Sequence, residues 1–76
     1  MSIDRVTVDH KVMGGVPVIR GTRIPVATIV GLFAQGLSAD LVLADYPTLV
    51  LEDLTAALEF ATLAVSERTL PLGLPA

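Results

Sequence analysis

The chain has 76 residues, a formal net charge of −3 and no cysteine. This length allows one domain, and without cysteine the chain has neither a disulfide framework nor thiolate chemistry. The acidic balance argues against a free-standing nucleic-acid binder, because that kind of binding depends on neutralising phosphates with Lys and Arg.

The apolar content is high for so short a chain. Glycine and the apolar residues other than tyrosine occupy 45 of the 76 positions, near 59%, against about 45–50% in ordinary domains. A domain of this size buries only about 60% of the surface that its unfolded chain exposes. Part of the apolar surface therefore needs a partner, and we expect a homodimer, which is the commonest closed assembly.

The N-terminal segment is predicted to form a β-hairpin. β-Branched residues dominate residues 3–8, which are predicted as a short strand. A loop over residues 9–15 leads to a second predicted strand over residues 16–19. A hairpin alone is barely stable in water, so this one must pack on helices or on a second chain.

A first helix is predicted after the hairpin. Pro25 fits the N1 position, where its missing N–H costs nothing. Gly36 is expected to end the helix in a left-handed conformation, with Leu37 packing back on Leu32 as in a Schellman motif. Gly31 inside the helix costs roughly 1 kcal/mol relative to alanine. Either simple tolerance or the close approach of another helix explains this glycine.

Two further helices are predicted. Ser38 caps a short second helix, which must end by Tyr46 because a residue that precedes proline is disfavoured in helical geometry. A third helix runs from residue 50 or 51 to about residue 66, and Thr48 is an alternative cap that would start it earlier. The predicted apolar face of the third helix consists of Leu51, Leu54, Leu58, Ala61 and Val65. Small residues at 57, 61 and 64 would let another helix approach closely.

These elements predict a mainly α fold. A short N-terminal β-hairpin precedes three helices with short connections, which is typical of a helix-turn-helix or homeodomain-like core. We assign residues 1–68 to this single domain and residues 69–76 to an extended C-terminal tail, since the two prolines in that segment forbid a regular helix.

Several spaced blocks form one pattern: Gly14-Gly15-Val16-Pro17, Ile19-Arg20-Gly21-Thr22-Arg23-Ile24-Pro25-Val26, Gly36-Leu37-Ser38, Asp45-Tyr46-Pro47-Thr48-Leu49 and Glu52-Asp53. The pattern resembles the signature of domain-of-unknown-function family 433, also described as VapB-like antitoxins of type II toxin–antitoxin systems. Two positions depart from it: Val16 replaces a common Lys or Arg, and Val50 replaces a capping Ser or Thr.

The resemblance implies a fold, a partner and a mode of action. Family members are grouped with homeodomain-like folds. Their partner would be a PIN-domain ribonuclease toxin, neutralised through a flexible C-terminal segment, and the complex of toxin and antitoxin would bind operator DNA.

Basic side chains near the glycine-rich loop are the candidates for nucleic-acid contact. Guanidinium groups bind phosphate or carboxylate through two parallel hydrogen bonds. The alternative is that an arginine holds the loop in place by pairing with an aspartate such as Asp45. The candidate nucleic-acid-binding residues are Arg5, Lys11, Arg20, Thr22 and Arg23.

The third helix is a poor candidate for reading DNA. It carries acidic residues and no basic residue before Arg68, so phosphates would repel it. The tail offers a different surface, because a Leu- and Pro-rich segment can lie extended in a groove of a partner. We therefore take Leu70, Leu72 and Leu74 as candidate partner-binding residues; a place in the dimer interface or a frayed terminus is the alternative.

Catalysis and metal binding have little support. The one histidine, His10, has no neighbouring nucleophile and acid that would form a catalytic triad, and no cluster of metal ligands stands out. We expect a cytoplasmic protein, not an enzyme, with no cofactor, no metal, no small-molecule substrate and no membrane role. The leading hypothesis is an antitoxin-like regulator. The alternatives are a homodimeric protein-interaction module with no nucleic-acid role and, last, an autonomous DNA-binding repressor.

Overall fold

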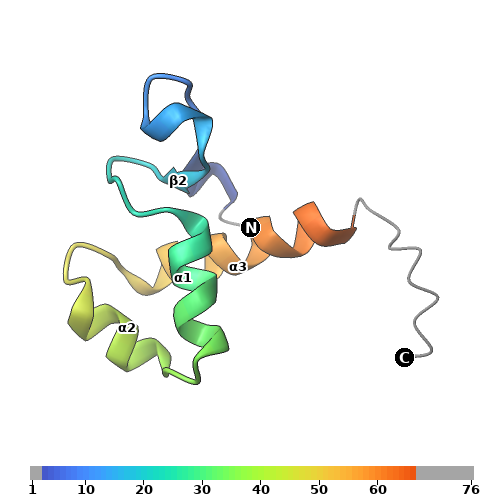
Figure 1. Ribbon diagram of the computed structural model, residues 1–76. Coiled ribbons are helices and arrows are strands. Elements are labelled where there is room, and N and C mark those ends of the chain that lie inside the picture. Colours follow the sequence, from blue (N-terminus) through green and yellow to red (C-terminus); the bar gives the residue numbers. More distant parts are fainter. Residues whose placement is uncertain (1–2, 67–76) are drawn as a thin grey trace.

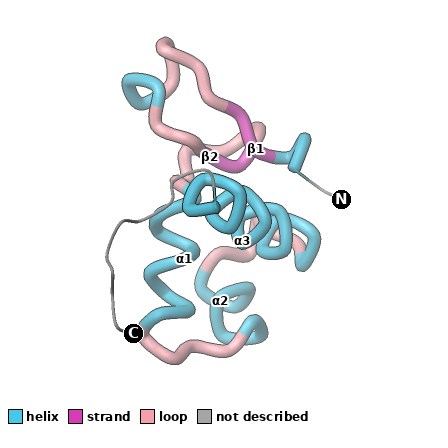
Figure 2. Tube along the Cα trace, turned by 90° about the vertical axis from the view of Figure 1, so that its right-hand side faces the viewer, coloured by secondary structure: helices cyan, strands magenta, loops and turns pink. Residues whose placement is uncertain are grey.

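The N-terminal hairpin lies on one side of the third helix, and the second helix lies on the other (Figures 1 and 2). The computed structural model describes residues 3–66. The elements are η1 (Ile3–Arg5), β1 (Val6–Thr7), η2 (Met13–Gly15), β2 (Val18–Ile19), α1 (Val26–Ala34), α2 (Ala39–Asp45) and α3 (Leu51–Ser66). The predicted mainly helical fold, with three helices after an antiparallel hairpin, is confirmed.

The hairpin is shorter than predicted. β1 pairs antiparallel with β2, with Val6 opposite Ile19, while residues 3–5 form a 3₁₀ turn instead of strand. The predicted strand over residues 3–8 is therefore wrong at both ends, and the predicted strand over residues 16–19 is wrong at its start. Pro17 has no N–H to offer the ladder, and its carbonyl accepts instead from the N–H of Val26 at 3.0 Å.

α1 begins one residue later than predicted. Pro25 is the N-cap, with φ −67° and ψ 147°, and Val26 is the first helical residue. The prediction of Pro25 at N1 is wrong because Pro25 is still extended, in a bridge with Val18. The C-terminus agrees with the prediction, since Gly36 (φ 93°) donates to the carbonyl of Phe33 at 2.9 Å and Leu37 donates to that of Leu32 at 3.2 Å. These two bonds define a Schellman motif.

α2 has the predicted cap. The Ser38 hydroxyl accepts from the N–H of Leu41 at 3.2 Å. The helix ends at Asp45, and Tyr46 has non-helical angles of φ −125° and ψ 76°, as its position before Pro47 requires.

α3 begins at Leu51, so an earlier start capped by Thr48 is wrong. Its buried residues are Asp53, Leu54, Ala56 and Ala57. Three members of the predicted apolar face are exposed instead: Leu51, Leu58 and Val65. The buried face is rotated toward Asp53, whose carboxylate pairs with Arg5 and accepts from the N–H of Val50. The core around it consists of Val6, Ile19, Val26, Ile29, Val42, Leu49, Leu54, Ala56 and Ala57.

Replacing two glycines by alanine should have opposite effects on the free energy of unfolding. A Cβ added at Gly21 or Gly31 would meet nothing within 4 Å, but Gly21 has φ +81° and Gly31 lies within α1. Gly21→Ala should lower the free energy of unfolding by about 1–2 kcal/mol through left-handed strain. Gly31→Ala should raise it by up to about 1 kcal/mol through helix propensity. Urea unfolding measures both, and shifts in the same direction would contradict these backbone assignments.

Candidate functional site

A tight turn holds the arginines of the glycine-rich loop. The carbonyl of Ile19 accepts from the N–H of Thr22 at 3.0 Å and from the Thr22 hydroxyl at 2.7 Å. The same hydroxyl accepts from the N–H of Ile24 at 3.0 Å. Gly21 has the positive φ that the third position of a type II turn requires. Thr22, a predicted nucleic-acid contact, thus has its hydroxyl engaged in closing the turn.

Arg20 holds the N-terminal turn. Its Nε and Nη2 donate to the carbonyl oxygen of Asp4 at 3.0 and 2.8 Å. Its main-chain N–H donates to the carbonyl of Arg5 at 2.7 Å. Arg20 therefore pins a loop, which was one of the two expected roles, but its acceptor is a main-chain carbonyl and not the carboxylate of Asp45.

Arg5 is paired with α3. Its Nη1 lies 3.0 Å from Oδ1 of Asp53, and the two side chains are 42% and 10% exposed. The other carboxylate oxygen, Oδ2, accepts from the N–H of Val50 at 3.0 Å. Val50 is not the expected Ser or Thr, but this bond keeps the other half of a capping box, in which an acidic side chain at N3 returns to the N-cap N–H.

Two predicted basic contacts remain available. Arg23 and Lys11 are exposed, and neither side chain has a hydrogen bond or ion pair to any residue within 3–66. Lys11 is held only through its main-chain N–H, which donates to Oδ1 of Asp9 at 2.8 Å. Of the five predicted basic and hydroxyl contacts, the structure brings together Arg5, which directly precedes β1, and Arg20, which directly follows β2. It leaves the charges of Arg23 and Lys11 for an outside ligand.

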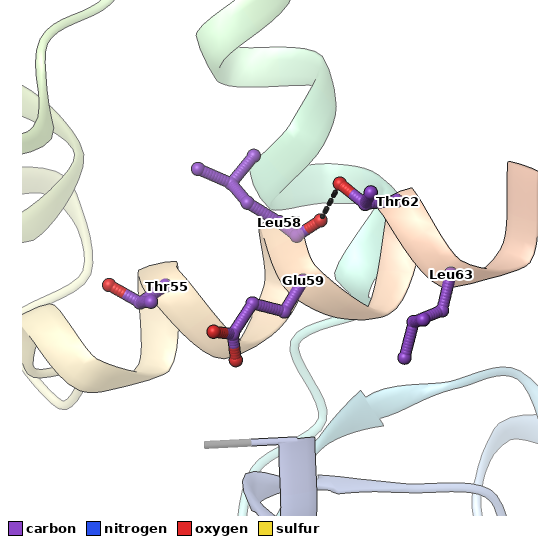
Figure 3. Close-up of a pocket in the computed structure, with 5 residues that line it drawn as sticks. All are labelled: Thr55, Leu58, Glu59, Thr62 and Leu63. Atoms are coloured by element: carbon purple, nitrogen blue, oxygen red, sulfur yellow. Dashed lines mark hydrogen bonds between the residues drawn. The ribbon is translucent and has the colours of Figure 1, made fainter. Parts of the chain in front are cut away.

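The outer face of α3 exposes two leucines among polar side chains. A shallow hollow of about 280 Å³ is lined by Thr55, Leu58, Glu59, Thr62 and Leu63 (Figure 3). Leu58 and Leu63 are 40% and 46% exposed. Thr62 uses its hydroxyl inside the helix, donating to the carbonyl of Leu58 at 2.8 Å. Leu58 and Leu63 thus stand exposed beside the polar side chains of Thr55, Glu59 and Thr62.

A second apolar hollow lies where α3 passes the start of α1. This groove, of about 260 Å³, is lined by residues that include Val16, Pro17, Val26, Val30, Ala61 and Ala64. The sequence prediction missed the groove, because it joins three distant segments. The signal was the row of small residues at 57, 61 and 64: Ala57 is fully buried, whereas the other two line the groove.

The tail candidates Leu70, Leu72 and Leu74 lie outside the described residues. Within residues 3–66 no group of three or more His, Cys, Asp or Glu side chains could hold a metal ion. No helix in that part of the chain is long and apolar enough to span a bilayer.

Most of this chain is similar to proteins of one known family. A family model described as "Protein of unknown function (DUF433)" matches residues 6–61. The crystal structure of a DUF433 member protein from Anabaena variabilis is similar, with a TM-score of 0.76 and 38% sequence identity, over 83% of this chain and 62% of that chain. This chain therefore spans less than two thirds of the length of that relative. No curated protein matches.

Proposed function

Because this chain belongs to the DUF433 family of proteins of unknown function, we propose its function from its surfaces. It is an antitoxin-like regulatory protein, not an enzyme, that binds and neutralises a partner protein. The observation that carries the proposal is the pair of exposed leucines on the outer face of α3, Leu58 and Leu63, which line one hollow. Protein interfaces are centred on a few such large anchors, which pack into pockets of the partner.

The proposed partner is a PIN-domain ribonuclease toxin. This choice rests on the antitoxin resemblance of the signature. The mechanism is steric: α3 and the tail residues Leu70, Leu72 and Leu74 cover the cleft of the toxin, and no catalytic group of this chain takes part. A ribonuclease toxin acts on cytoplasmic RNA, so the complex would form in the cytoplasm.

Co-purification with the product of the neighbouring gene tests this proposal. The tagged chain should elute with a PIN-domain protein at fixed stoichiometry and silence its ribonuclease activity. Leu63→Glu should weaken the complex at least about tenfold, because it places a charge among desolvated anchors. The matched control is Leu41→Glu on α2, a leucine that is 56% exposed against 46% for Leu63 and lies outside the proposed face; it should leave affinity unchanged.

The alternative is a homodimeric protein-interaction module with no nucleic-acid role. The same face of α3 and the adjoining groove would then meet a second copy. A dimer in analytical ultracentrifugation that neither binds the neighbouring gene product nor inhibits a ribonuclease would replace the antitoxin proposal with this one.

A second proposed activity is contact with operator DNA by the complex. Arg23 and Lys11 support it, since both are exposed and neither has a side-chain partner in the described part of the chain. Replacing both by alanine should reduce the salt dependence of DNA binding by about one unit of log–log slope for each phosphate that is no longer neutralised. The melting temperature serves as control and should stay within about 2 °C, because surface changes of this kind have small effects on stability. An unchanged slope would exclude these residues.

A further inference from the structure

The groove continues the core face of α3. Helical spacing places Ala57, Ala61 and Ala64 on one side of the helix. Ala57 has no exposed surface, Ala61 is half-buried and Ala64 is exposed. In Figure 1 the C-terminal half of α3 extends away from α1 and α2, so the face that is covered at Ala57 loses its cover one turn later. Within residues 3–66, no apolar segment covers this position.

The chemistry of the groove selects an uncharged aliphatic occupant. Every residue that lines the groove is apolar. The hairpin, α1 and α3 supply Val16, Pro17, Val26, Ala27, Val30, Phe60, Ala61, Ala64 and Val65. No charged side chain lines the groove, so a charged ligand would lose its hydration without gaining a partner.

We propose that residues 69–75 of the same chain occupy this groove, with the side chains of Leu70, Leu72 and Leu74 directed into it. Successive side chains of an extended segment point to opposite sides. This alternation places the three leucines on one face and Pro71 and Gly73 on the other. The stretch from Thr69 to Ala76 contains no charged side chain, which matches the groove.

The position of the tail in the chain favours it over a second copy. α3 ends at Ser66, two residues after Ala64, which lines the groove. Seven extended residues reach about 23 Å, whereas the groove follows α3 for less than two helical turns. A tethered segment acts at an effective concentration near the millimolar range, and a second copy must first overcome the entropy cost of association.

If the tail occupies the groove, the groove and a partner protein compete for Leu70, Leu72 and Leu74. While they fill the groove they cannot contact a partner, and a partner that takes them uncovers the groove. This step goes beyond antitoxin function and stands whether or not the partner is a toxin.

Methyl NMR on the full chain tests the proposal. The intact protein should show nuclear Overhauser effects between the methyls of Leu70, Leu72 or Leu74 and those of Val26 and Val30. The triple variant L70S, L72S, L74S should abolish these effects and shift the groove methyl signals. The matched control is Leu41→Ser, an exposed leucine on α2, which should leave the groove signals unchanged. The methyls of the fully buried Val42 should not move in the triple variant if the fold is intact.

A mixture of ¹³C-labelled and unlabelled chains separates the possible occupants. Nuclear Overhauser effects confined to one chain support the proposal. Effects between labelled and unlabelled chains would overturn it and assign the groove to a second copy. Absence of these effects, with groove signals identical in the intact chain and the triple variant, would overturn it as well.

Discussion

The Arg5–Asp53 ion pair joins the two parts of this fold. Its partners are 48 positions apart in sequence, and Arg5 Nη1 lies 3.0 Å from Asp53 Oδ1. Asp53 is only 7% exposed, so a carboxylate there without its partners would be costly. The second carboxylate oxygen holds the start of α3 through Val50. One side chain therefore fixes both the hairpin and the first turn of the longest helix.

Other polar residues of the family signature also hold the N-terminal hairpin and its turns in place. Arg20 ties β2 to the carbonyl of Asp4, and Thr22 closes the turn that leads into α1. Much of the signature is therefore used to assemble a hairpin that would not be stable alone. Within the signature, the charge of Arg23 stays available for contact with other molecules. Outside the signature, the exposed leucines of α3 are available as well.

The sequence predicted the elements whose causes are local. The Ser38 cap and the Schellman ending at Gly36 each depend on residues within one turn of helix, and both were found as expected. Errors arose where a distant contact decides the outcome. Pro25 remains extended because it faces Val18 across a bridge, and Asp53 turns inward because Arg5 on the hairpin pairs with its carboxylate.

The candidate site also combines features that the sequence predicted with features that depend on distant contacts. Residue type alone marked Arg5, Arg20, Thr22, Arg23 and Lys11 as contacts. It could not show that the first three are engaged inside the chain, because the acceptor of each depends on how the turn and hairpin fold. Apolar periodicity also failed to predict the exposure of Leu58, because the buried face of α3 includes a charged residue, Asp53.

A double-mutant cycle on Arg5 and Asp53 tests the central claim that this pair unites hairpin and helix. Arg5→Met keeps the aliphatic stem, and Asp53→Asn keeps an oxygen for the N–H of Val50. Urea unfolding of the two single variants and the double variant should give a coupling free energy of about 1–2 kcal/mol. A control cycle between Lys11→Met and Asp53→Asn should give a coupling within about 0.5 kcal/mol of zero. Additive effects of the Arg5 and Asp53 substitutions would contradict the claim.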